Sequence, residues 1–350
     1  MANENKLQAI IAHCKEYGFI FPSSEIYDGL GAVYDYGQYG VELKRNIRDY
    51  WWRSMTQMHD NIVGIDAAIF MHPTVWKASG HVDNFSDPMI DNKDSKKRYR
   101  VDHLIEGHAE TLDEAARTAL LARMDQLLAV DDFAGLKQLI EENNIKCPVS
   151  GTANWTDIRQ FNLMFATEFG AVASDEDNKV YLRPETAQGI FVNFLNVQKT
   201  GRMKIPFGIA QTGKAFRNEI VARGFIFRMR EFEQMEMQFF VRPGTQQEWY
   251  NYWKEERMKW HLSLGISPEK YRFHDHVKLA HYADAACDIE YDFPMGFREV
   301  EGIHSRTDFD LKNHQEYSRK KMQYFDNDLD ENGKPYGNYI PYVVETSIGL

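Results

Sequence analysis

The sequence has few cysteines and no long apolar run. Only three of its 350 residues are cysteine, Cys14, Cys147 and Cys287, and no two of them form a C-x-x-C pair. Few, widely spaced cysteines predict a reducing compartment and no disulfide framework. No apolar stretch is long enough to span a bilayer, and the first ten residues lack the features of a signal peptide. We therefore expect a cytoplasmic protein with no membrane partner.

Several familiar catalytic motifs are also missing. The sequence contains no Gly-x-Ser-x-Gly elbow and no Walker loop, which excludes serine hydrolases of that type and P-loop ATPases. His274, His276 and His281 lie close together in the sequence, but no cysteine or acid completes a tetrahedral set at a recognised interval. We therefore favour a structural role for these histidines over a metal site.

Positive charge is scarce relative to negative charge. The chain has 41 Lys and Arg against 52 Asp and Glu, a formal net charge of −11, whereas nucleic-acid-binding domains are usually basic. Two basic clusters, 96–100 and 319–321, could contact phosphate or be solvated surface, and we favour surface for the second. Hydrophobic residues make up 43% of the chain, enough for one large domain or for one domain with an insertion.

Hydrophobic periodicity predicts a mixture of helices and strands. Residues 111–114 have the pattern of a capping box and predict a helix that ends near Ala129. Four further helices are expected from helical spacing, over residues 6–17, 41–58, 132–142 and 246–264. Residues 23–40 have the composition of a loop. From Asn154 onward strands dominate, and the last strand is expected over residues 339–346, after a hairpin or loop tip at 331–335.

The most informative segment, residues 216–240, has the pattern of two strands joined by a polar turn at 222–224. Period-two alternation in the second strand places on one face Arg228, Arg230, Phe232, Gln234 and Glu236. The other face carries Met229, Met235, Met237 and Phe239, with Glu231 and Glu233. Guanidinium groups beside an aromatic ring suit a nucleotide, with arginine on phosphate and the ring on the base. The segment therefore predicts a nucleotide site.

This segment resembles motif 2 of the class II aminoacyl-tRNA synthetases. Residues 183–189 (RPETAQG) are similar to the glycyl-tRNA synthetases of the homodimeric type. Further matches run in order along the chain, at 34–37, 39–44, 73, 76–81, 147–148, 152–155, 159–165 and 305–311, and 345–350 resembles the start of motif 3. The resemblance implies an α+β class II catalytic fold over residues 1–350, an antiparallel sheet flanked by helices, with a helical insertion at 101–150.

The sequence also departs from the family pattern. It ends at Leu350, just before the Asp-Arg pair that completes motif 3 in the family and whose arginine holds the ATP γ-phosphate. The family's C-terminal anticodon-binding domain is absent from it, so we expect the sequence to be either a fragment or incomplete. Thr346 stands where many relatives carry proline, which bears on backbone stiffness rather than on the reaction. Some relatives hold zinc in a cysteine-rich insertion, but the equivalent residues here, 91–95, contain no cysteine, so no zinc is expected.

The reaction implied by the resemblance is an ATP-dependent ligation. Glycine is activated to glycyl-adenylate with release of pyrophosphate, and the glycyl group then passes to the 3′ end of tRNA(Gly). The implied catalytic residues are Arg217 at the α-phosphate, Glu219 at the adenine amino group and Arg228 at the β- and γ-phosphates, with Phe232 stacked on adenine. Glu299 is the implied Mg²⁺ ligand, acting through ATP. The full set of implied ATP contacts is Arg217, Asn218, Glu219, Phe227, Arg228, Met229, Arg230, Glu231, Phe232, Glu299, Val300 and Gly349.

A pocket for glycine should be small and acidic. Glu185, Glu236 and Glu345 match the family's ammonium-binding acids, Ser347 adds a hydrogen bond, and Arg100 meets the carboxylate. Neighbouring carboxylates repel one another unless a cation lies between them. The alternative is that each acid pairs with a nearby arginine such as Arg183. The full set of implied glycine contacts is Arg100, Glu185, Phe232, Glu233, Gln234, Met235, Glu236, Glu345, Thr346, Ser347, Ile348 and Gly349.

The resemblance also implies a homodimer, with helix 41–58 and the strand after it in the interface. Spacing alone would instead place Ile47, Trp51, Met55 and Met58 in the intramolecular core. The insertion is equally compatible with a contact to the tRNA acceptor end and with a purely structural role.

Two other functions are weighed against this one. A non-catalytic, synthetase-like accessory protein that binds nucleic acid or a polymerase typically loses the phosphate-binding arginines, whereas Arg217 and Arg228 are present. A synthetase for another small amino acid is disfavoured by residues 183–189 and by the three acids.

Overall fold

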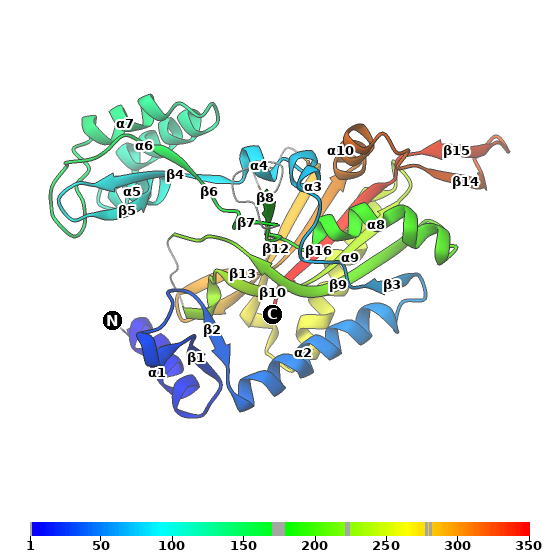
Figure 1. The fold of residues 1–350 in the computed structure, drawn as a ribbon, viewed down its shortest axis with the longest axis horizontal. Coiled ribbons are helices and arrows are strands. Elements are labelled where there is room, and N and C mark those ends of the chain that lie inside the picture. The colour runs from blue at the N-terminus through cyan, green and yellow to red at the C-terminus, as the bar shows by residue number, and fades with distance from the viewer. Residues whose placement is uncertain (1, 170–178, 221–224, 277–278, 280–281) are drawn as a thin grey trace.

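The computed structural model describes residues 2–169, 179–220, 225–276, 279 and 282–350, and one seven-stranded sheet forms its centre (Figure 1). The strand order is β11-β12-β13-β16-β10-β9-β3, and every pairing is antiparallel except that of β3 with β9. The strands are β3 (Ile62–Ile65), β9 (Phe207–Phe216), β10 (Glu231–Val241), β11 (Tyr271–Asp275), β12 (Ala285–Phe293), β13 (Gly296–Thr307) and β16 (Tyr342–Gly349). This mostly antiparallel sheet with flanking helices confirms the expected α+β class.

Helices cover both faces of the sheet, because the central strands alternate their side chains between the two sides. Met237 and Phe239 of β10 pack with Trp51 of α2 and with α9, whereas Phe240 packs with α8 and α10. These helices are α2 (Gln38–Thr56), α8 (Ala187–Thr200), α9 (Gln246–Ser263) and α10 (Phe309–Ser318). Figure 1 shows α2 and α9 on one side of the sheet and α8 on the other. Within the described part of the chain, no helix has both the length and the apolar character needed to cross a bilayer.

The insertion has a hydrophobic core of its own. A small sheet in the order β5-β4-β6 packs with three helices around Ile90, Leu136, Ile140 and Trp155. Its elements are β4 (Ser86–Asn92), β5 (Lys97–Arg100), α5 (Val101–Ala109), α6 (Glu114–Leu128), α7 (Phe133–Glu142) and β6 (Arg159–Asn162). Figure 1 shows them grouped at one end of the molecule. The N-cap of α6 is Asp113 rather than the predicted Thr111, because the Asp113 carboxylate accepts the Ala116 N–H at 2.9 Å.

The remaining elements differ from the sequence expectation in several places. Helices α5, α8 and α10 were not predicted, and neither were the short helices α3 (Pro73–Ala78) and α4 (His81–Asn84). The stretch 23–40 contains β2 (Tyr34–Tyr36), which pairs with β1 (Ile20–Pro22). The expected strand over 339–346 is divided, because residues 335–339 form β15 (Pro335–Tyr339) in a hairpin with β14 (Tyr324–Leu329), and β16 begins at Tyr342. Other elements are α1 (Ala2–Glu16), β7 (Ala166–Glu168) and β8 (Lys179–Tyr181).

Candidate active site

The β9–β10 hairpin forms the centre of the site, but its second strand starts later than the sequence predicts. β10 begins at Glu231, which pairs with Phe216 of β9. Residues 225–227 form a short 3₁₀ helix, and Arg228 and Arg230 precede the strand. The row of side chains on one strand face therefore runs from Phe232 through Glu236 and does not include the two arginines. The predicted turn at 222–224 lies outside the described residues.

Arg217 lies between two aromatic rings just after β9. Its guanidinium carbon is 5.2 Å from the ring centroid of Phe232 and 5.6 Å from that of Phe85, both within cation–π range. The Arg217 Nε donates to the Pro184 carbonyl at 3.0 Å, and its backbone N–H donates to the Arg230 carbonyl at 2.9 Å. These contacts hold Arg217, the expected α-phosphate ligand, beside Phe232, the ring expected to stack on adenine.

A second charged group surrounds Asp87 of β4. Arg100 Nη1 is 3.3 Å from the Asp87 carboxylate, and Arg100 Nε donates to Asp102 at 2.8 Å. Burial raises the pKa of Asp87, although Arg100 and Arg228 lie close enough to oppose the shift. The carboxylates of Asp102, Asp87 and Glu219 contribute to a raised pKa of Arg100. The structure thus gathers Arg100, Glu219 and Arg228 into one group, in which a substrate carboxylate would compete with two acids for Arg100.

Glu299 lies in β13 near Asp288 of the neighbouring strand β12. Although much of the Glu299 side chain is exposed, withdrawal of its carboxylate from water and the Asp288 charge raise its pKa, against the influence of His304 and Arg217. Asp288 is hydrogen-bonded to His276 Nε2 at 2.8 Å. A carboxylate whose charge is disfavoured by a neighbouring carboxylate suits a position beside a cation.

Three acids from separate elements lie together, of which Glu236 and Glu345 are buried and Glu185 is half-buried. Glu185 precedes α8, Glu236 lies in β10 and Glu345 lies in β16. Burial, followed by the charges of Glu345 and Glu185, raises the pKa of Glu236 well above its usual range. Thr186 and Gln238 donate hydrogen bonds to Glu236. The structure therefore brings together the three acids for which the sequence predicts an ammonium-binding role.

Basic side chains hold two of these acids in the charged form. Glu345 accepts from Arg306 Nη1 at 3.0 Å and is hydrogen-bonded to His304 Nδ1 at 2.8 Å. Burial alone would raise the pKa of Glu345, but Arg306 and His304 lower it. His81 Nε2 lies 3.5 Å from Glu185, and His81 and Arg306 outweigh burial to lower the pKa of Glu185 to about 2.

Arg183, the partner named in the alternative prediction, binds backbone instead of the acids. Its Nε donates to the Lys214 carbonyl at 2.6 Å and its Nη1 to the Ala67 carbonyl at 2.8 Å. Gly213 leaves room for this guanidinium, because a Cβ at Gly213 would collide with Arg183 Nη2. The pairing with Arg183 is therefore wrong, and Arg306 supplies the paired guanidinium for Glu345.

Several predicted glycine contacts lie on the opposite face of the sheet. Glu233 forms an ion pair with Lys44 of α2 at 2.9 Å. Met235 and Ile348 belong to the core covered by α2 and α9, and the side chain of Thr346 is buried on the same side. The cause is strand alternation, which sends successive side chains to opposite faces. Side-chain contact of these four residues with glycine is therefore not supported, and only their backbone borders the site.

The other predicted residues lie around the hairpin and the end of β16. Arg230 Nε donates to the Glu219 carbonyl at 2.8 Å, and Glu231 pairs with Lys214 at 2.7 Å. Gln234 Oε1 accepts the Thr186 N–H at 3.1 Å, and its Nε2 is 3.4 Å from Ser347 Oγ. Of the rest, Asn218 and Val300 are half-buried, Met229 is buried, and Phe227 and Gly349 are exposed.

Sequence reasoning gave no role to a buried network behind the acids. Arg306 donates to both oxygens of Asp310, at 2.9 and 3.1 Å, as well as to Glu345. Gln188 Nε2 donates at 3.0 Å to both Glu185 and Asp310. A signal was available, because Arg306, Asp310 and Gln188 all lie in the segments 183–189 and 305–311 that carry the resemblance, and a buried arginine needs carboxylate partners.

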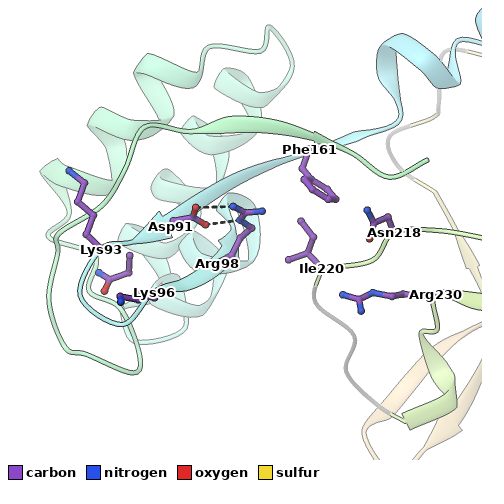
Figure 2. Close-up of a pocket in the computed structure, with 9 residues that line it drawn as sticks. Asp91, Lys93, Lys96, Arg98, Phe161, Asn218, Ile220 and Arg230 are labelled. Atoms are coloured by element: carbon purple, nitrogen blue, oxygen red, sulfur yellow. Dashed lines mark hydrogen bonds and ion pairs between the residues drawn. The ribbon is translucent and has the colours of Figure 1, made fainter. Parts of the chain in front are cut away.

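A cleft of about 540 Å³ separates the insertion from the hairpin (Figure 2). Its lining residues are Asp91, Asn92, Lys93, Lys96, Arg98, Phe161, Asn218, Ile220 and Arg230. Figure 2 shows Arg98 and Phe161 of the insertion facing Ile220, Asn218 and Arg230 across the cleft. Arg98 is bonded to Asp91 at 2.7 Å, so Lys93, Lys96 and Arg230 provide the excess positive charge of the lining.

Among the residues that the structure describes, no group of three or more His, Cys, Asp or Glu side chains could hold a metal ion. His274 is hydrogen-bonded to Glu290 at 3.0 Å and His276 to Asp288 at 2.8 Å, so each has a single carboxylate partner. His281 lies outside the described residues. The absence of zinc stays a prediction.

Comparison with known proteins shows relatives that cover nearly the whole chain. "Glycyl-tRNA synthetase insertion domain 1" matches residues 87–120 and 113–163, and "tRNA synthetase class II core domain (G, H, P, S and T)" matches residues 165–324. The chain is 57% identical to a glycine–tRNA ligase of Chlorobaculum tepidum, over 98% of this chain and 73% of the relative. It is 52% identical to that of Macrococcus caseolyticus, over 99% and 72%, and 53% identical to that of Staphylococcus saprophyticus, over 98% and 71%.

Proposed function

This chain belongs to the glycine–tRNA ligase family of class II aminoacyl-tRNA synthetases, and from that premise we propose that it forms glycyl-tRNA(Gly). In the first step the glycine carboxylate attacks the α-phosphate of ATP and pyrophosphate leaves. In the second step a hydroxyl of the tRNA 3′-terminal adenosine attacks the glycyl carbonyl and AMP leaves. The observation that carries this proposal is that the Arg217–Phe232 pair and the three-acid group border the same face of β10.

Arg217 and Phe232 are the proposed nucleotide contacts. Adenine would stack on the Phe232 ring, while the guanidinium beside that ring reaches the α-phosphate and neutralises the charge that develops there. Preorganisation supports this role, because the Arg217 Nε is already held by the Pro184 carbonyl. Arg228 and Glu219 are the proposed contacts to the outer phosphates and to the adenine amino group.

Glu185, Glu236 and Glu345 are the proposed ammonium ligands. An ammonium group placed among them would supply the positive charge that relieves their mutual repulsion. Glu236 has the most to gain, since its hydrogen-bond donors, Thr186 and Gln238, are neutral. Ser347 and Gln234 lie at the rim of this group and are the proposed additional polar contacts.

Class II synthetases use ATP with Mg²⁺, and the chain offers carboxylates that fit the ion. The Asp288 charge helps to raise the pKa of Glu299, and oxygen donors in such a position fit a hard divalent cation. Mg²⁺ bound there would draw negative charge from the phosphates. Glu299, with Asp288 beside it, would hold the ion and orient the pyrophosphate end of ATP.

The cleft in Figure 2 is the proposed route of the tRNA acceptor end. Lys93, Lys96 and Arg230 line it, and such side chains contact phosphates without reading sequence. The cleft opens beside Asn218, so a 3′ end lying in it would approach the proposed ATP site. The overall negative charge of the chain makes this local positive lining the natural place for RNA.

We also propose a cytoplasmic homodimer. All three cysteines are free, as expected in a reducing compartment. Trp51 and Met55 of α2 pack within the chain, as spacing alone predicts, whereas Met58 is 78% exposed. Leu43, 52% exposed, lies with Tyr39 and Val41 on the part of α2 left uncovered, which supports a partner there. Light scattering coupled to gel filtration tests this, and a purely monomeric mass would refute it.

The test of the reaction is amino-acid-dependent exchange between ATP and pyrophosphate. We expect exchange with glycine and far less with alanine or serine, and exchange with another small amino acid instead would favour a different synthetase. No exchange with any amino acid would favour the non-catalytic accessory protein.

A further inference from the structure

The side-chain amide of Gln238 bridges two of the three acids. Its Nε2 lies 2.9 Å from Glu236 Oε1 and 2.6 Å from Glu345 Oε2. Gln238 is fully buried, lies two residues beyond Glu236 on the same face of β10, and is directly opposite Glu345 in the β10–β16 register. A primary amide has two N–H groups and can donate to both carboxylates at once.

The other end of this amide has no partner. Gln238 Oε1 is buried and accepts no hydrogen bond from the residues that the structure describes. An unpaired buried acceptor costs stability, and an apolar side chain of the same length would avoid that cost. Reversing the amide would place its oxygen against Glu345, which Arg306 and His304 keep charged, and is therefore disfavoured. The two acids therefore account for both the presence of the glutamine and its orientation.

Both ends of the bridge are anchored. The oxygen of Glu345 that accepts from Gln238 also accepts from Arg306 Nη1 at 3.0 Å, and Arg306 is fixed by its two bonds to Asp310. The second oxygen of Glu236 accepts from the Thr186 hydroxyl. Gln238 is the element between these anchors. Its amide is the neutral donor that the two carboxyl groups share.

We propose that Gln238 is a positioning residue for amino-acid recognition, because its amide donates to both Glu236 and Glu345 and so fixes the orientation of the two carboxyl groups proposed to bind the ammonium group. This inference rests on the proposed function and extends it, since Gln238 does not itself touch the substrate. Loss of the bridge lets the two acids move apart and weakens ammonium binding. It leaves the proposed ATP contacts, Arg217 and Phe232, in place, because these lie near the start of β10, away from Gln238.

Gln238→Met tests the proposal, since methionine keeps the length of the side chain and removes its donors. We expect the glycine KM to rise about 10- to 100-fold, the range given by losing a hydrogen bond to a charged group. The ATP KM and the rate at saturating glycine, counted per active site by a burst of adenylate, should change less than about threefold. Ser305→Ala is the control, because it removes another buried polar atom, one that has no hydrogen-bond partner.

A second variant keeps the test decisive if methionine prevents folding. Gln238→Glu preserves the shape, and a protonated carboxyl there can donate to only one of the two acids, so a smaller rise in glycine KM is expected.

In a Glu236→Gln background, Gln238→Met should add less than it does alone, because the bridge already lacks one charged end. An unchanged glycine KM in a folded variant, or an equal rise in both KM values, would overturn the proposal. Absence of glycine-dependent exchange in the unmodified chain would instead refute the proposed function.

Discussion

Glu236 is placed to bind a ligand, and its burial lowers the stability of the unliganded protein at neutral and higher pH. Burial and the charges of Glu345 and Glu185 raise its pKa, so the folded chain retains a proton that the unfolded chain releases above about pH 4.3. The corresponding stability is present below that pH and is lost as the pH rises through the folded pKa. Glu236→Gln should therefore raise Tm by about 2–4 °C at pH 8, with little gain at pH 4. Calorimetry at the two pH values checks this, and an equal shift at both would contradict it.

The same substitution should have the opposite effect on function. A glutamine at 236 keeps its partners Thr186 and Gln238 but offers the ammonium group no charge. We expect the glycine KM to rise about 10- to 100-fold, because a charge-assisted hydrogen bond is replaced by a neutral one, and the ATP KM to change much less. Steady-state exchange kinetics with each substrate varied separately measure this. A glycine KM that does not change would argue against the acid pocket.

Arg217 is the residue on which the proposed chemistry depends most. Arg217→Ala removes a preorganised positive charge from the α-phosphate and should lower the rate of adenylate formation by about 10²–10³-fold. Folding should be intact, because the side chain is only half-buried and its main partners are a carbonyl and two ring faces. Single-turnover adenylate formation is the measurement. Lys320→Ala, in the basic cluster expected to be plain surface, is the control, and wild-type activation by Arg217→Ala would refute the assigned role.

At the scale of elements, α9 is tied to the sheet by a buried charged cluster beneath the site. Arg257 Nε donates to Glu301 at 2.6 Å, and His261 is hydrogen-bonded to the other oxygen of Glu301 at 2.8 Å. Glu301 of β13 has no exposed surface. Arg257→Met leaves this carboxylate without its guanidinium and should destabilise the protein by about 3–5 kcal/mol.

Denaturant unfolding of Arg257→Met measures that loss, and the same helix provides a matched control. Lys259 pairs with Glu256 at 2.7 Å, but the lysine is 67% exposed. Because solvent screens an exposed pair, Lys259→Met should leave the stability of the protein nearly unchanged. Similar losses for the two variants would show that the buried cluster does not hold α9 to the sheet.

The elements that the sequence predicted well are those with one strong apolar period. α2, α7 and α9 were expected close to their observed bounds, and alternation from Phe232 to Phe239 correctly separated the core face of β10 from the site face. α8 and α10 were missed because they begin inside polar motifs, so their first turns carry Gln188 and Asp310 rather than an apolar pattern. The start of β10 was misplaced because alternation cannot show where a hairpin loop ends.

The same distinction holds for the site. Sequence motifs predict which residues belong to it, but only the fold determines which of them are in contact. Family motifs predicted the three acids by number, and the structure gathers them. Which basic side chain keeps which acid ionised depends on contacts between residues that are far apart in the sequence, such as Arg306 with Glu345 and His81 with Glu185. No spacing rule links His81 to Glu185, since the contact requires α4 to lie over the loop before α8. The alternative that paired the acids with Arg183 was wrong for the same reason, because it inferred contact in space from proximity in the sequence.

At the scale of the whole molecule, the insertion and the sheet form two bodies with a positively lined cleft between them (Figures 1 and 2). If the tRNA acceptor end lies in this cleft, aminoacylation and adenylate formation should respond differently to its charge. Reversing Lys93 and Lys96 to glutamate should raise the tRNA KM at least about tenfold and reduce its salt dependence, since each lost phosphate contact lowers the salt slope by about one. Glycine-dependent ATP–pyrophosphate exchange should stay near wild type, because neither lysine belongs to the proposed ATP or glycine sites.

Charge reversal at Lys320 and Lys321, outside the cleft, gives a control with the same change in net charge. An equal loss in both double variants would mean that overall charge, rather than the cleft, governs tRNA binding.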